Sequence, residues 1–103
     1  MTFNEQKKEF RKSKEWKEFT KALKEERKVD ALTLQKLRKG SISHHLDLNP
    51  DNYKVLDKAN FETLNMKSHE VVHFLYNYYK KDPTIIDRLK DILHKMILLN
   101  GDW

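Results

Sequence analysis

The stretch NFETLNMKSHEVVH, residues 60–73, decides the fold because it changes from the pattern of a strand to the pattern of a helix. Its first six residues are typical of a short strand. From Met66 onward the sequence predicts a helix, with Asn65 or Ser68 as the N-cap. This helix is expected to end before Pro83, because the residue that precedes a proline avoids the helical conformation.

The segments around this stretch predict two more helices and a second strand region. Residues 4–28 contain good helix formers without Gly or Pro, and predict one long helix. Residues 29–46 predict one or two short strands with a turn at the letters RKGS. Residues 47–58 are expected to form a loop, and residues 83–99 show the apolar face of a final helix. The expected fold class is therefore α+β.

Basic residues are concentrated in the first part of the chain. The 103-residue sequence has a net charge of +5, and residues 1–40 alone contain 13 Lys/Arg and 7 Asp/Glu, a net of +6. A one-sided basic segment suggests a polyanionic partner, usually nucleic acid. The alternative is a helix whose charges serve only solubility.

The composition excludes several classes of protein. The chain has no cysteine, which excludes disulfides, a Cys-ligated zinc site and a thiol nucleophile. No apolar run approaches the roughly 18 residues of a membrane span, so no membrane partner is expected. The first ten residues, MTFNEQKKEF, lack the apolar segment of a secretory signal. We therefore expect a cytoplasmic protein with a single domain.

Four of the five histidines form two close pairs in the sequence. His69 and His73 are four residues apart in a predicted helix, so their rings share one face and suit two ligands of one divalent metal. His44 and His45 are neighbours in a predicted strand, where adjacent side chains point to opposite faces. One of them could bind the metal while the other acts as a general base toward a substrate held there.

The spacing of these residues resembles that of the HNH (ββα-metal) nuclease family. His45 precedes Asn60 by 15 residues, Asn60 precedes His69 by 9, and His69 precedes His73 by 4. The segment NFETLNMKSH is similar to the family pattern N-L-x-x-L-C-x-x-C-H, with asparagine, leucine and histidine in the same places. Asn65 and Ser68 stand where many relatives have two cysteines that bind a structural zinc, so no structural Cys-zinc is expected.

The resemblance implies a fold and a set of residue roles. It implies a ββα-metal core over residues 30–82, flanked by the basic helix in 1–28 and an apolar C-terminal helix in 83–103, in one domain of residues 1–103. The core would be a metal-dependent endonuclease that hydrolyses DNA, of the small stand-alone type found in phages and bacteria. The implied general base is His45, which Asn60 would orient, and the implied metal ligands are His44, His69 and His73.

The identity of the metal stays open among Zn²⁺, Ni²⁺, Mn²⁺ and Mg²⁺. Three imidazoles favour a borderline ion, whereas Mg²⁺ prefers oxygen ligands. Four basic side chains near the predicted site are candidates for contacts with DNA phosphates, with solvated surface charges as the alternative. These are Lys36, Arg38, Lys39 and Lys67.

Two other functions are compatible with the sequence. The first is a non-catalytic phage factor that binds DNA or a host protein on an HNH scaffold. The second is a zinc peptidase, because His69-Glu70-Val71-Val72-His73 fits the motif H-E-x-x-H, with Glu70 as the general base. A third zinc ligand would then come from further along the chain. The candidates are Asp87, Asp91 and His94.

Overall fold

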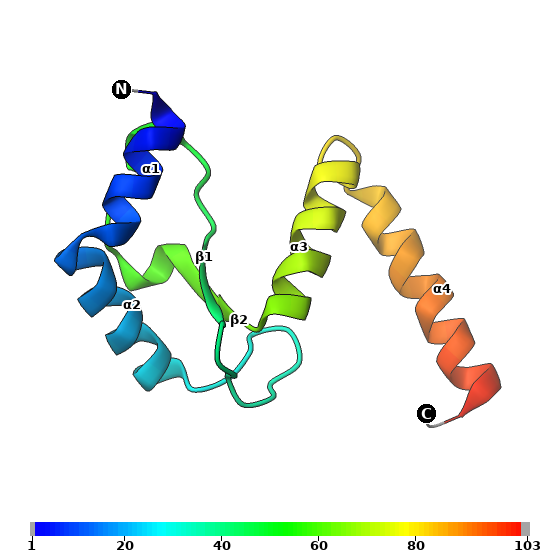
Figure 1. The fold of residues 1–103 in the computed structure, drawn as a ribbon. Helices are drawn as coiled ribbons and strands as arrows, with labels where there is room; N and C mark the ends of the chain where they lie inside the picture. The colour runs from blue at the N-terminus through cyan, green and yellow to red at the C-terminus, as the bar shows by residue number, and fades with distance from the viewer. Residues whose placement is uncertain (1, 102–103) are drawn as a thin grey trace. The chain divides into compact units, whose positions relative to one another are not determined.

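The α+β class is confirmed by a computed structural model, which describes residues 2–101 (Figure 1). It contains four α-helices and a two-stranded antiparallel sheet within these residues. The chain divides into two compact units, residues 1–69 and 70–103. No helix in the described part of the chain is long and apolar enough to cross a membrane.

The N-terminal segment forms two helices, α1 (Phe3–Lys12) and α2 (Lys14–Arg27), so the prediction of one long helix over residues 4–28 is wrong. Ser13 separates them with an extended backbone, at φ −68° and ψ 152°. Its hydroxyl accepts a hydrogen bond from the Trp16 backbone N–H at 3.2 Å. A serine oxygen that satisfies a free N–H in this way is a favourable start for a new helix.

The sheet is a hairpin of β1 (Ile42–His45) and β2 (Phe61–Leu64), which confirms the strand predicted in residues 60–65. In this register His44 lies opposite Glu62 and His45 lies opposite Phe61. Because strand side chains alternate, His44 and His45 point to opposite faces of the hairpin. Strand β1 confirms the prediction of one or two short strands over residues 29–46, and the earlier part of that region forms only an isolated bridge between Val29 and Lys36.

Helix α2 covers the face of the hairpin that carries His45 and Phe61. Leu23 and Phe61 are almost fully buried there, with relative exposures of 0% and 1%. The Phe19 ring lies 5.0 Å from the Phe61 ring, and the Thr20 hydroxyl is hydrogen-bonded to the Ser43 hydroxyl. These contacts pack α2 against one face of the hairpin, with the core between them.

The loop between the strands is anchored by an aromatic side chain. It contains two short 3₁₀ turns, Pro50–Asn52 and Lys58–Asn60. Tyr53 lies between these turns, and its ring is 5.7 Å from the rings of both Phe3 and Phe10 in α1. The loop therefore holds α1 against the rest of the first unit.

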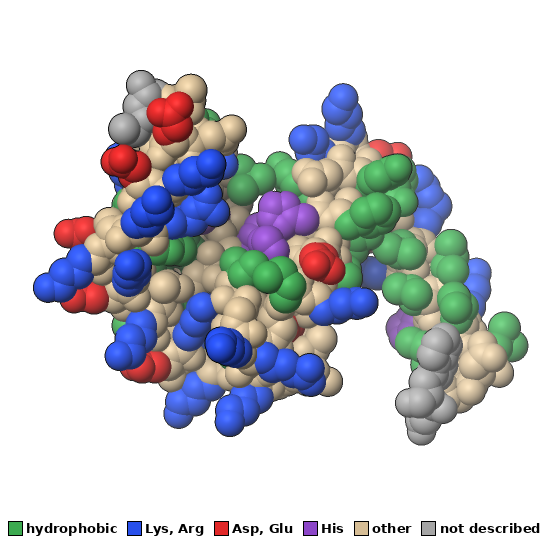
Figure 2. Space-filling model, viewed as in Figure 1, with side chains coloured by type: hydrophobic (Ala, Val, Ile, Leu, Met, Phe, Trp, Pro, Cys, Tyr) green, Lys and Arg blue, Asp and Glu red, His purple; other side chains and the backbone are tan. Residues whose placement is uncertain are grey.

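Basic side chains gather over α1 and α2 on the surface of this unit (Figure 2).

A buried carboxylate joins the segment after α2 to the start of helix α3 (Met66–Tyr79). Asp30 is 0% exposed, and it accepts hydrogen bonds from the backbone N–H groups of Leu32 at 2.8 Å and Thr33 at 2.7 Å. Its other oxygen accepts the backbone N–H of Asn65 at 2.7 Å. The Ser68 hydroxyl also donates to Asp30. One side chain thus connects a tight turn with the first turn of α3.

Asn65 adds a second connection between the same segments. Its side-chain oxygen accepts the Arg38 N–H at 2.8 Å, and its side-chain nitrogen donates to the Lys36 carbonyl at 3.1 Å. The side chain of Asn65 is therefore used for a tertiary contact and not for the N-cap that the sequence suggested.

The second unit consists of the remainder of α3 and of helix α4 (Thr84–Asn100). The two helices predicted from Met66 to before Pro83 and over residues 83–99 are confirmed, with ends that differ by at most three residues. Asp82 accepts the Thr84 N–H at 3.1 Å at the start of α4. No residue of α4 is buried, and apolar side chains such as Ile92 and Ile97 are about half exposed.

Asp30 should make a measurable contribution to stability. Burial raises its pKa, but the hydrogen bonds that it accepts outweigh burial and lower the pKa to about 2. Asp30→Asn should lower the free energy of unfolding by about 3 kcal/mol, because an amide nitrogen would face backbone donors. Urea denaturation at neutral pH measures this, with the exposed Asp51→Asn as the control. Equal stability of the two variants would contradict the assigned role.

The same carboxylate predicts a pH dependence. The folded-state pKa lies below the ordinary value of 3.8. The stabilisation is therefore fully present above about pH 4 and is lost as the pH falls toward about 2. The difference in unfolding free energy between the wild type and Asp30→Asn should narrow over this range. A difference that stays constant down to pH 2 would show that the charge of Asp30 is not what stabilises the fold.

Candidate metal centre

Two histidines of the candidate centre come from successive turns of one helix. His69 and His73 lie on α3, which is continuous across the boundary between the two units. Their rings share one face of the helix because residues four apart are neighbours on its surface. Asn65 and Asp30 hold the first turn of α3, so the position of His69 relative to the hairpin is set inside the first unit.

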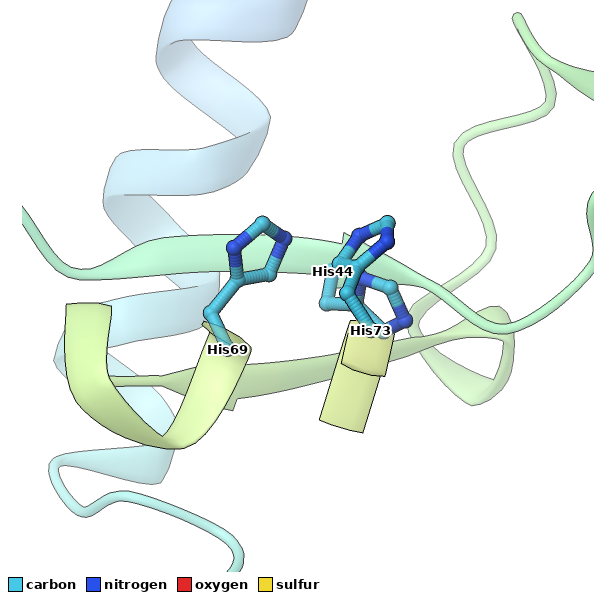
Figure 3. A group of neighbouring side chains, drawn as sticks. All are labelled: His44, His69 and His73. Atoms are coloured by element: carbon cyan, nitrogen blue, oxygen red, sulfur yellow. The ribbon is translucent and has the colours of Figure 1, made fainter. Parts of the chain in front are cut away.

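The third histidine of the centre comes from the hairpin. His44 lies on β1, and its ring centroid is 5.1 Å from that of His69, with the rings edge to face. One ligand nitrogen from each of His44, His69 and His73 lies within 4.8 Å of the other two (Figure 3). His44 and His69 are half-buried and His73 is exposed. The structure therefore brings together the three histidines that were predicted as metal ligands.

The donor set suits a divalent metal. Neutral imidazole is a common ligand of Zn²⁺, Ni²⁺ and other borderline ions. Three protein ligands leave coordination positions open for water or a substrate, as in catalytic rather than structural zinc sites. These residues fit such an ion by chemistry and by proximity, and the cluster supplies no oxygen ligand of the kind that Mg²⁺ prefers.

His45 lies on the other face of the hairpin, between two aromatic rings. Its ring is stacked on Trp16 at 5.6 Å and on Tyr53 at 4.4 Å, at interplanar angles of 11° and 12°. The Nε2 atom donates a hydrogen bond to the Tyr53 carbonyl at 3.0 Å. Because a carbonyl oxygen can only accept, this bond places the proton on Nε2 and the lone pair on Nδ1. Trp16 and Tyr53 stack on the ring, and its two nitrogens lie on the ring edge, where any proton transfer takes place.

The surroundings of His45 favour the neutral ring. Burial lowers its pKa below the ordinary value, and the positive charges of Lys7 and Arg11 lower it further. The hydrogen bond to the Tyr53 carbonyl and the charge of Asp47 act in the opposite direction. The neutral form is the one that can accept a proton, as a general base must.

Asn60 positions the chain beside His45 through its backbone. Its carbonyl accepts the N–H of Leu46, the residue after His45, at 2.8 Å. The partner of the His45 ring is Tyr53, which the sequence did not identify. The stacking of Trp16 on His45 was also not predicted. Neither contact could be found from motif spacing, because the rings come from a separate helix and from the loop.

The four basic residues predicted near the site lie around the start of α3. The backbones of Lys36 and Arg38 are held by Asn65, Lys39 follows in the turn, and Lys67 is in the first turn of the helix. All four are exposed, and within residues 2–101 none of these side chains takes part in an ion pair. Their placement is compatible with contacts to phosphates near His69.

No protein-family model, curated protein or solved structure matches the chain. A function must therefore be inferred from the spacing of the residues and from the geometry of the site.

In the structure, the two histidines of the H-E-x-x-H motif are grouped with His44 from the hairpin. Glu70 is exposed on α3, directly after His69. In the part of the chain that the structure describes, the one cluster of three potential ligands joins His69 and His73 to His44. That cluster includes none of the α4 residues proposed as a third zinc ligand. Asp91, one of those residues, forms an ion pair with Lys95 at 2.9 Å.

Metal binding can be tested directly on the histidines. The wild type should bind one Ni²⁺ or Zn²⁺ per chain in isothermal titration calorimetry. His44→Ala and His69→Ala should each weaken metal binding by at least about a hundredfold. Loss of a residue that only orients a metal ligand already lowers affinity by about 10–100-fold, and loss of the ligand itself should lower it further. His94→Ala removes an exposed histidine of α4 and is the matched control. Unchanged affinity in both ligand variants would contradict the site.

Proposed function

We propose that the protein is a metal-dependent endonuclease of the HNH type, which hydrolyses phosphodiester bonds in DNA. The observation that supports this most directly is the meeting of His44 with His69 and His73, from a strand and a helix. The order β1, β2, α3 along the chain is the order that a ββα-metal core requires. The basic surface of the N-terminal residues is compatible with a polyanionic substrate.

The proposed reaction divides its chemistry between two faces of the hairpin. A divalent ion bound by the three histidines would supply Lewis-acid stabilisation to the phosphate and to the leaving 3′ oxygen. His45 would take the proton from the attacking water at Nδ1, while the Tyr53 carbonyl holds Nε2–H. Since His45 is the last residue of β1, the edge of its ring lies where the strand ends. The products would carry 5′-phosphate and 3′-hydroxyl groups.

The stacking of His45 has a defined purpose in this proposal. Trp16 and Tyr53 stack on the ring, and its hydrogen bond to the Tyr53 carbonyl fixes its orientation. A base whose orientation is set before the substrate binds loses less entropy in the transition state. The lowered pKa keeps the ring neutral at the pH of the cytoplasm, where we propose that the protein acts.

His45→Phe is the sharpest test of the catalytic proposal. Phenylalanine can keep the stack with Trp16 and Tyr53 but has no ring nitrogen. Cleavage should fall by at least about a hundredfold, the usual lower contribution of a general base. The measurement is nicking of supercoiled plasmid with Mg²⁺, Mn²⁺, Ni²⁺ or Zn²⁺, with EDTA as the blank. Metal affinity should be unchanged. Wild-type cleavage by His45→Phe would refute the assignment.

Glu70 separates the nuclease from the peptidase. If the protein is a nuclease, Glu70→Gln should leave plasmid cleavage within about twofold of the wild type, because an exposed side chain outside the cluster contributes little to the reaction. Casein should not be hydrolysed by either protein. Casein hydrolysis that is lost in Glu70→Gln would establish the peptidase instead. DNA binding without metal-stimulated cleavage would favour the non-catalytic factor.

A further inference from the structure

A groove of about 560 Å³ lies along the C-terminal half of α2. One side is formed by the helix and the other by the segment that follows it. Its lining includes Lys21, Lys24, Lys28, Val29, Lys36 and Leu37. All of these residues belong to the first unit. None of them is part of the histidine cluster.

The backbone holds the two sides of the groove together. Helix α2 ends at Arg27, and Lys28 adopts a left-handed conformation with φ of 64°. The Leu37 N–H then donates to the Lys28 carbonyl at 3.1 Å, and Val29 pairs with Lys36 in an isolated bridge. These contacts place Lys36 across from the helix on a fixed backbone, so lysines line both sides of the groove.

The charge of the groove is strongly positive. Four of its lining residues are lysines, and one, Glu25, is acidic. Within residues 2–101, the side chains of Lys21, Lys28 and Lys36 take part in no ion pair. Four lysines beside one glutamate leave an excess of positive charge around the groove, which attracts an anion.

Lys24 connects the groove to the hairpin. Its Nζ donates to the Ser41 carbonyl at 2.6 Å, directly before β1 begins. Burial lowers the pKa of Lys24, because an ammonium group loses part of its hydration there. The opposite end of β1 carries His45. The strand between them is about 10 Å long at the usual rise per residue. This length corresponds to about three base pairs along a DNA helix.

We propose that this groove binds the phosphodiester backbone of DNA, as a second contact that anchors the substrate while the histidine site acts on a bond nearby. The choice of DNA rests on the proposed function. Lys21 and Lys24 are neighbours on one face of α2, and Lys28 follows directly after the helix, so three positive charges succeed one another along this side of the groove, as the phosphates do along a nucleic-acid strand. The net charge of +6 over residues 1–40 extends beyond the groove, and so favours a long polyanion over a short acidic peptide.

The test is DNA binding in EDTA, where no cleavage is required. Fluorescence anisotropy with a labelled duplex is measured at several salt concentrations. The triple variant Lys21→Gln, Lys28→Gln, Lys36→Gln should bind at least about tenfold more weakly at moderate salt, and the slope of log K against log salt should flatten by about 2–3. Lys24 is left unchanged because it hydrogen-bonds to the hairpin. The control neutralises three exposed lysines of the second unit, at positions 80, 81 and 90.

The outcomes separate this proposal from the nuclease. If the triple variant loses affinity and salt dependence and the control does not, the groove is supported, whether or not the wild type cleaves DNA. Equal losses in both variants, or no loss in either, would overturn it. Wild-type protein that binds a poly-glutamate peptide more tightly than the duplex would also overturn it. If the triple variant does not fold, the single variants Lys21→Gln and Lys36→Gln should each reduce the salt slope by about 1.

Discussion

The buried carboxylate of Asp30 is the interaction on which the candidate site depends. It accepts backbone donors from its own turn and from Asn65, directly before α3, so the turn after α2 and the start of α3 cannot move independently. The position of α3 decides where His69 lies relative to His44 on the hairpin. The same turn is followed by Lys36, which forms part of the basic groove. One low-pKa carboxylate therefore positions residues of both proposed sites.

The hairpin separates the proposed metal ligand from the proposed base by strand alternation alone. His44 faces α3, while His45 faces α2 and the aromatic rings of Trp16 and Tyr53. The two imidazoles therefore have different surroundings and different chemistry, although they are adjacent in the sequence. One lies beside two further histidines and can bind a cation. The other is kept neutral and oriented by burial and by a carbonyl.

The local parts of this structure could be predicted from the sequence, and the tertiary contacts could not. The strand after Asn60 and the helix after Met66 follow from short-range patterns, and the pair His69 and His73 follows from helix periodicity. The break at Ser13 was missed because a serine in a run of helix formers becomes a cap only when the packing of its neighbours favours one. The hydrogen bond from His45 to Tyr53 depends on how the loop folds back, which no spacing encodes.

Two polar residues hold the start of α3. Asn65 and Ser68 stand where the family that the sequence resembles has zinc-binding cysteines, and the structure uses both to hold the start of α3. The Asn65 side chain forms hydrogen bonds with the backbones of Arg38 and Lys36. The Asn65 backbone N–H and the Ser68 hydroxyl both donate to Asp30. A zinc ion would link the same two segments through sulfur ligands. Here a carboxylate and an amide link them through hydrogen bonds. The hydrogen bonds that Asp30 accepts lower its pKa to about 2, so the carboxylate is ionised and can accept these donors at neutral pH.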